Sequence, residues 1–114
     1  MTEVTVYHNP RCSKSRHALS MIKDKGIEPN LIEYMKTPLS KEELVQLLKK
    51  LDLSPQDILR RSETEYRTLR LDKASDEAIL IAILAHPNLI ERPIVVVNQH
   101  AVIARPVEKL LTLF

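Results

Sequence analysis

In the first third of the chain, hydrophobic residues first alternate with polar ones, then recur at helical spacing, and then alternate again. A β-branched run with alternating character at residues 4–8 predicts a short strand. Asn9-Pro10 ends it, because proline restricts the residue before it. A helical pattern follows from Cys12 or Ser13 to Lys25, with Gly26 as its C-cap residue, and residues 31–34 predict a second strand. Together they predict a βαβ unit with parallel strands. The buried stripe of the helix is predicted to comprise Ala18, Leu19 and Ile22.

The middle of the chain is helical in pattern. Ser40 and Glu43 form a capping-box signature, and leucines follow it at helical spacing, at positions 44, 47, 48 and 51. Ser54-Pro55 predicts another short helix with proline in its first position, turning Ile58 and Leu59 inward. These features begin a helical insert over about residues 40–86.

The second half of the insert is less regular. Residues 66–71 predict a turn or a short helix. Residues 75–77 cap a further helix that runs to Ala85, where His86-Pro87 stops it. Because this helix is apolar nearly all round, we expect it to be well buried.

The chain then returns to strands. Residues 93–97 and 101–104 flank Asn98-Gln99-His100, which predicts an antiparallel hairpin. Arg105-Pro106 opens a final helix to Leu113. The predicted order is βαβ, helical insert, ββα, which makes an α/β fold with a mixed sheet flanked by helices. We expect residues 1–114 to form a single domain.

Composition narrows the class of protein. The 114 residues carry a formal net charge of +2, which is too small to indicate a nucleic-acid or membrane partner. A single glycine excludes a glycine-rich phosphate loop. One cysteine allows no internal disulfide, which fits the reducing cytoplasm. The sequence shows no secretory signal and no apolar run long enough to span a bilayer.

Cys12 is the main candidate for chemistry. It is the only cysteine, and the first turn of a helix places it beside unsatisfied N–H groups at the positive end of the helix dipole. That position favours thiolate and can also hold an oxyanion above the sulfur. Arg11, Lys14, Arg16 and His8 are candidates to add positive charge. A free cysteine is often a small core residue instead, but these polar neighbours favour a nucleophile.

Two arginines lie at predicted element boundaries, where binding residues are common. Arg92 precedes Pro93 before a strand, and Arg105 precedes Pro106 before a helix. Arginine suits oxyanions, because its charged guanidinium carries five fixed donors. A solvated surface arginine is the alternative at each position. The histidines lack zinc-type spacing and no metal-ligand cluster is present in the sequence, so we expect no metal site.

These motifs together resemble one family. The motifs are similar to those of the glutaredoxin-coupled arsenate reductases. They are, in chain order, residues 7–10, Cys12, Ser15-Arg16, Arg60, residues 92–96 and Arg105-Pro106. The chain resembles their single-cysteine Cys-Ser-Lys-Ser-Arg variety. The resemblance covers essentially the whole chain, and it implies a thioredoxin/glutaredoxin-like fold.

The resemblance also implies roles for individual residues. Cys12 would attack arsenate to form a thiol–arsenate adduct. The oxyanion would be bound by Arg60, Arg92 and Arg105. His8 would support the thiolate or serve as a hydrogen-bonded structural histidine, and Ser15 and Arg16 would lie on the same helix face as the cysteine. Pro93 would be a cis-proline facing it.

A lone cysteine cannot resolve such an adduct internally. The family therefore implies glutathione as co-substrate thiol, followed by glutaredoxin, with release of arsenite and no bound cofactor. This reaction would serve arsenic detoxification. Two alternatives are a general glutathione-dependent thiol oxidoreductase and a regulator of the same fold that binds RNA polymerase. A second cysteine at position 15 would favour that regulator, but serine stands there.

Overall fold

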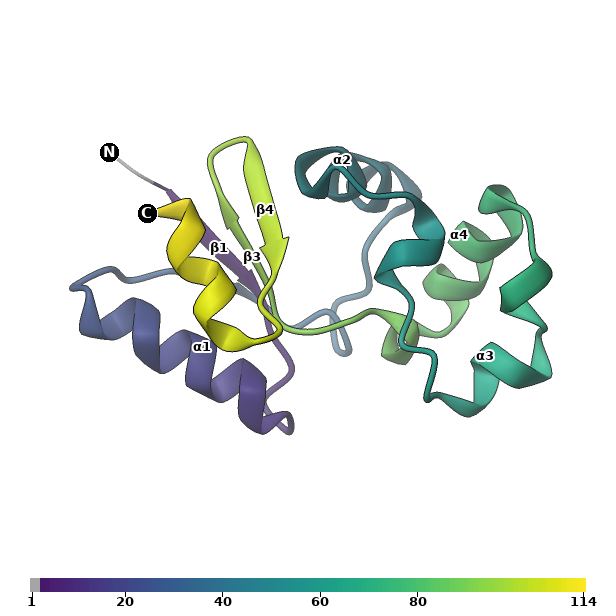
Figure 1. Cartoon of the computed structure of the whole chain (residues 1–114), viewed down its shortest axis with the longest axis horizontal. Helices are drawn as coiled ribbons and strands as arrows, with labels where there is room; N and C mark the ends of the chain where they lie inside the picture. Colours follow the sequence, from purple (N-terminus) through teal and green to yellow (C-terminus); the bar gives the residue numbers. More distant parts are fainter. Residues whose placement is uncertain (1–2) are drawn as a thin grey trace. The chain divides into compact units, whose positions relative to one another are not determined.

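The computed structural model describes residues 3–114. Figure 1 shows the order of the elements, and they divide between two compact units. Of the described residues, the first unit comprises 3–37 together with Arg92–Phe114, and the second comprises Pro38–Glu91. The second unit spans nearly the same residues as the predicted helical insert. The single domain expected over residues 1–114 stays a prediction. Residues 1 and 2 lie outside the described range.

The first unit is built on a four-stranded mixed sheet in the order β2-β1-β3-β4. Strand β1 (Val4–Tyr7) pairs in parallel with β2 (Asn30–Ile32), as the βαβ pattern predicted. It pairs antiparallel with β3 (Ile94–Val97), and β3 pairs antiparallel with β4 (His100–Ile103). The predicted fold class is thereby confirmed.

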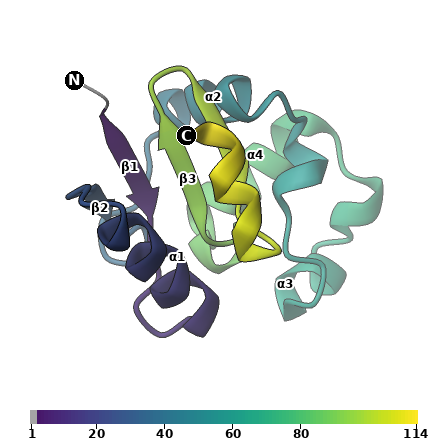
Figure 2. The same cartoon turned by 60° about the vertical axis from the view of Figure 1, so that its left-hand side comes forward.

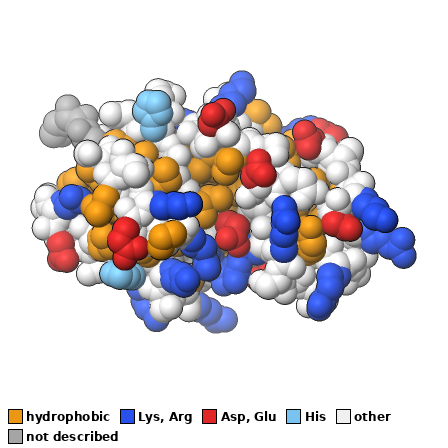
Figure 3. Space-filling view, viewed as in Figure 1, with side chains coloured by type: hydrophobic (Ala, Val, Ile, Leu, Met, Phe, Trp, Pro, Cys, Tyr) orange, Lys and Arg blue, Asp and Glu red, His pale blue; other side chains and the backbone are white. Residues whose placement is uncertain are grey.

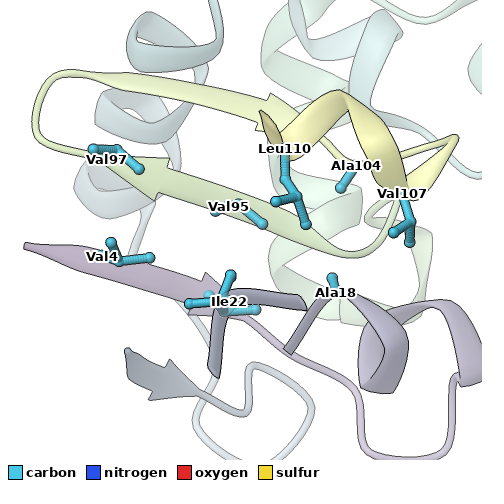
Figure 4. Close-up of a cluster of buried hydrophobic side chains, with 9 residues drawn as sticks. Val4, Ala18, Ile22, Val95, Val97, Ala104, Val107 and Leu110 are labelled. Carbon is cyan, nitrogen blue, oxygen red and sulfur yellow. The ribbon is translucent and has the colours of Figure 1, made fainter. Parts of the chain in front are cut away.

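Two helices cover one face of this sheet. They are α1 (Ser13–Asp24) and the 3₁₀ helix η4 (Val107–Leu113), which lie beside each other in Figure 2. Val4, Val6, Val95 and Val97 point to this face, because alternate strand residues share a side. Figure 4 shows how Ala18 and Ile22 of α1 meet Val107 and Leu110 of η4 over these valines. This core fixes α1, and with it Cys12 at the start of the helix.

The second unit is helical. It contains α2 (Lys41–Leu51), η1 (Pro55–Ile58), α3 (Thr64–Thr68), η2 (Leu71–Lys73), α4 (Asp76–Ala85) and η3 (Pro87–Leu89). The predicted capping box of α2 is present, with Ser40 and Glu43 exchanging side-chain and backbone hydrogen bonds. The four predicted leucines of α2 are buried, and so are Ile58 and Leu59. Leu59 also forms a single antiparallel bridge with Ile90.

Several details differ from the sequence prediction. Strand β2 ends at Ile32 rather than Tyr34, because a turn begins at Glu33. The prediction that α4 is well buried was wrong for one face, where Ile81 is 59% exposed. Leu19 of the predicted α1 stripe is only half-buried, whereas Ser15 is fully buried. The last helix is 3₁₀ rather than α.

None of the helices in residues 3–114 is long and apolar enough to cross a membrane.

Candidate active site around Cys12

Cys12 occupies the N-cap position of α1 with an extended backbone conformation. The turn before it is fixed by two hydrogen bonds: the Cys12 N–H donates to the Asn9 carbonyl at 2.9 Å, and the Arg11 N–H donates to Asn9 Oδ1 at 3.0 Å. These bonds form because Asn-Pro sequences favour turns closed by the asparagine side chain. The thiol therefore lies at the free N–H groups of the first helical turn, as the sequence predicted.

Two arginines from other elements reach this thiol. Arg105 Nη2 lies 4.0 Å from Cys12 Sγ, and Arg105 Nε donates to the carbonyl oxygen of Arg92 at 2.6 Å. Arg92 lies two residues before β3 and Arg105 lies two residues after β4. Their proximity follows from the β3–β4 hairpin, which returns the chain so that the Ala104 N–H donates to the Pro93 carbonyl at 2.8 Å. The structure thus brings Cys12, Arg92 and Arg105 together.

The same groups change the acidity of the thiol. Burial raises the pKa of Cys12, but the Ser15 N–H, the Arg92 guanidinium and the Lys14 N–H each lower it and together outweigh burial. The net pKa is below that of an ordinary cysteine. Positive charge and helix N–H groups favour the thiolate in this way. In the space-filling view, Lys and Arg side chains gather at the bottom of the picture, where α1 begins (Figure 3).

The Arg92 guanidinium interacts with two groups of the site, the Cys12 thiol and the Tyr34 hydroxyl. Burial lowers the pKa of Arg92, but its interactions with the Cys12 thiol and the Tyr34 hydroxyl outweigh this and raise it above the ordinary value. Tyr34 is fully buried. Sequence reasoning placed Tyr34 at the end of a strand and gave it no functional role, since nothing local indicates that a residue 58 positions away is its neighbour. Arg92 Nε is buried and has no hydrogen-bond acceptor among residues 3–114.

His8 and Ser15 form a buried pair behind the cysteine turn. The Ser15 hydroxyl lies 2.7 Å from His8 Nδ1, and the Asn9 N–H donates to Ser15 Oγ at 3.1 Å. The serine hydroxyl can donate to Nδ1 or accept from it, depending on the histidine tautomer, and in either case it links the imidazole to the cysteine turn. Burial lowers the pKa of His8, Glu33 raises it and Arg16 lowers it, with a net decrease. A neutral His8 adds no positive charge, so the geometry favours its structural role.

The remaining predicted residues occupy distinct places. Arg16 Nη1 donates to the Pro10 carbonyl at 2.7 Å, so it braces the cysteine turn. The Arg92–Pro93 bond is cis, as the resemblance implied, and the Arg105–Pro106 bond is cis as well.

Arg60 belongs to the second unit, immediately after η1 and Leu59. Its Nη1 lies 3.2 Å from Glu63 Oε1 and its Nε lies 3.5 Å from Glu91 Oε1. The two glutamates were not anticipated, because residues 60–63 form a turn rather than a helix and Glu91 lies far along the chain. The expected position of Arg60 beside Cys12 stays a prediction.

Comparison with known proteins shows the family of the chain. A profile of the ArsC family matches residues 7–113. The chain belongs to the ArsC family.

Several relatives are similar over nearly their whole length. An uncharacterized protein of Escherichia coli (strain K12), YfgD, is 44% identical, with 96% of this chain and 94% of the relative covered. An arsenate reductase of Neisseria meningitidis serogroup A is 42% identical, with 96% and 97% covered. The solved structure of an arsenate reductase from Vibrio cholerae is 42% identical and has a TM-score of 0.95, with 99% of this chain and 98% of that one covered. The fold is therefore the thioredoxin-like fold of the ArsC family.

Within residues 3–114, no group of His, Cys, Asp and Glu side chains is arranged to hold a metal ion.

Proposed function

We propose that the protein reduces arsenate to arsenite, with Cys12 as nucleophile and glutathione as the second thiol. The observation that carries this proposal is the convergence of the Cys12 thiol with Arg92 and Arg105 at the start of α1. It combines a thiol of lowered pKa with fixed positive donors, which is what attack on an oxyanion requires. The arsenate reductases among the relatives support arsenate as that oxyanion.

In the first step, the Cys12 thiolate attacks arsenic and an arsenate oxygen leaves as water after protonation. The sulfur–arsenic adduct carries negative charge on its remaining oxygens. The donors closest to these oxygens would be the guanidinium groups of Arg92 and Arg105 and the N–H groups of Lys14 and Ser15. Arg92 Nε is a buried donor that lacks an acceptor among residues 3–114, and such donors are costly unless a ligand satisfies them.

Reduction needs two electrons, which two thiols supply by becoming a disulfide. The balance is arsenate plus the Cys12 thiol plus glutathione, giving arsenite, the Cys12–glutathione disulfide and water. A glutaredoxin thiol then attacks the glutathione sulfur of this disulfide, and the Cys12 thiolate leaves. The chain has no second cysteine that could do this internally. Turnover therefore depends on external thiols, which places the reaction in a reducing compartment such as the cytoplasm.

The test is arsenate-dependent NADPH oxidation by the purified protein with glutathione, glutaredoxin and glutathione reductase. Wild-type protein should turn over and Cys12→Ser should not, while both give the same circular dichroism spectrum. Turnover that persists in Cys12→Ser would contradict the nucleophile. An inactive wild type that still exchanges Cys12 with mixed disulfides would instead support a general thiol oxidoreductase.

A further inference from the structure

A small hollow lies beside the cysteine turn in the first unit. Its volume is about 200 Å³. It is lined by the turn after β1 and by the segment after β2, at Asn9, Pro10, Arg11, Glu33, Met35 and Lys36. These segments are neighbours because β1 and β2 are parallel, with Tyr7 opposite Ile32, so both strands end at the same edge of the sheet. Ligands commonly bind at this carboxyl edge of parallel strands.

The walls of the hollow are fixed by hydrogen bonds of the backbone and of the Asn9 side chain. The His8 N–H donates to the Ile32 carbonyl at 2.8 Å and joins the two segments. On one side, Asn9 closes the turn that carries Arg11. On the other, the N–H groups of Lys36 and Thr37 both donate to the Glu33 carbonyl at 2.9 Å. The shape of the hollow is therefore set before any ligand arrives, which lowers the entropic cost of binding.

The charges around the hollow are of both signs and accessible. Glu33 and Lys36 form an ion pair at 3.7 Å, with 39% and 76% of their side chains exposed. Arg11 is exposed and makes no ion pair within residues 3–114. An exposed pair of this kind is weak, so a ligand with matching charges can exchange with it. Met35, which is 44% exposed, adds an apolar surface.

Two cations and one carboxylate around a small apolar surface match the head group of an α-amino acid. Such a group carries an ammonium and a carboxylate on one carbon, joined to methylene groups. Glutathione presents this group at its γ-glutamyl end, with its thiol in the middle of the molecule. The hollow is smaller than the roughly 300–1,000 Å³ of pockets for whole ligands, so it would hold one end of glutathione only. Cys12 follows Arg11 directly in the chain, so the rest of glutathione would extend from the hollow toward the Cys12 sulfur.

We propose that this hollow is the subsite for the γ-glutamyl end of glutathione, with the carboxylate on Arg11 and Lys36 and the ammonium on Glu33. The proposal rests on the proposed function, since it supplies the second thiol of that reaction. It explains how a protein with one cysteine selects its external thiol. The oxyanion donors Arg92 and Arg105 take no part in it, so substrate and thiol are recognised by separate residues.

The test measures thiol exchange without arsenate. Cys12 is first converted to a mixed disulfide with thionitrobenzoate. The glutathione thiolate then attacks the Cys12 sulfur, and thionitrobenzoate leaves with the electron pair of the broken bond and is measured by its absorbance. Glutathione is compared with cysteinylglycine, which lacks the γ-glutamyl group, and with 2-mercaptoethanol, each corrected for its own thiol pKa.

Wild-type protein should react faster with glutathione than with the two smaller thiols. Glu33→Gln and Arg11→Gln should each reduce this preference about two- to fivefold, as expected for exposed charge contacts, and the double variant about tenfold or more. The rate with 2-mercaptoethanol is the reference for each variant, so that any general effect on the reactivity of Cys12 cancels from the preference for glutathione. Lys23→Gln and Glu28→Gln remove exposed charges near the other end of α1 and should leave the preference intact.

Two results would overturn the subsite: a wild type that shows no preference for glutathione, or a preference that survives in the double variant. Either can occur while arsenate is still reduced, so failure of the subsite is distinct from failure of the proposed function. Conversely, a glutathione preference that depends on Glu33 and Arg11 would support the subsite even if the coupled arsenate assay showed no turnover.

Discussion

Arg105 donates from its Nε to the backbone carbonyl of Arg92 at 2.6 Å, and the same guanidinium lies 4.0 Å from the Cys12 sulfur. Arg105 therefore holds the backbone of Arg92 in place, and both guanidinium groups face the Cys12 sulfur. The bond to the carbonyl uses the Nε position, while Nη2 of the same guanidinium faces the sulfur. Lysine would keep the charge but could not make both contacts, because it has no rigid fork of donors.

Arg105→Lys and Arg92→Lys should therefore weaken anion binding more than folding. Each charge-assisted hydrogen bond contributes about 1.5–3 kcal/mol, so we expect affinity for sulfate or arsenate to fall about 10- to 100-fold. The measurement is the protection of Cys12 from iodoacetamide by increasing sulfate. Arg67→Lys, at an exposed position of α3, is the control. Urea unfolding should change by less than about 1 kcal/mol; a loss of stability as large as the loss of affinity would make the arginines structural.

The lowered pKa of Cys12 predicts fast alkylation at neutral pH. The rate with iodoacetamide follows the thiolate fraction, so its midpoint should fall below the roughly 8.5 of a free cysteine. Arg92→Gln should move the midpoint upward, because Arg92 is one of the groups that lower the pKa. The Ser15 and Lys14 N–H groups remain in this variant and should keep part of the effect. A wild-type midpoint at or above 8.5 would contradict the anion-stabilising site.

The Ser15 hydroxyl should contribute substantially to the free energy of unfolding, although it is a small group. Ser15→Ala leaves the buried Nδ1 of His8 and the Asn9 N–H without their partner, which should cost about 1–3 kcal/mol of unfolding free energy. Urea denaturation measures this loss. Ser13→Ala, an exposed serine two positions earlier in the same helix, is the matched control and should change stability by less than about 0.5 kcal/mol. Equal losses in both variants would show that the buried hydrogen bonds of Ser15 do not contribute to the free energy of unfolding.

Local signals predicted the first turn of α1 and the helix caps well. Cys12 was expected at the helix start because Asn9-Pro10 and the following helical period are both encoded within a few residues. The capping box at Ser40 is encoded in four residues, and it formed as predicted. Such features need no knowledge of the rest of the chain.

Features that depend on distant contacts were not predictable in the same way. Tyr34 was assigned to a strand from its β propensity, but the chain turns at Glu33 and Tyr34 lies near Arg92 instead. The composition of α4 suggested burial on all sides, yet burial depends on what packs around it, and Ile81 stays exposed. The arginines of the site were found by resemblance to a family, since boundary position alone does not distinguish Arg92 from a solvated arginine.

Arg60 is held by two carboxylates in the second unit, and this predicts a competition. If Arg60 binds the oxyanion, the anion must replace Glu63 and Glu91 on its guanidinium. Glu63→Gln removes one competing charge and should strengthen sulfate protection of Cys12 about two- to fivefold, as expected for a partly exposed pair. Glu42→Gln, an exposed glutamate of α2, should have no effect. Weaker protection in Glu63→Gln would show that Glu63 positions Arg60 rather than competing for it.

Finally, burial of a neutral His8 predicts a stability that depends on pH. The pKa of His8 is lowered in the folded protein, with burial as the largest cause, so below the ordinary value of about 6.5 the unfolded chain binds more protons than the folded one. Stability contributed by His8 is therefore complete above pH 6.5 and is lost as pH falls toward and through the folded-state pKa.

Urea unfolding at pH 7.5 and pH 5.5 measures this dependence. Wild-type protein should lose more stability between these two values than His8→Gln, which has no imidazole to protonate. His17→Gln removes an exposed histidine of α1 and should keep the wild-type dependence. If His8→Gln and wild type changed equally with pH, the titrating group would lie elsewhere.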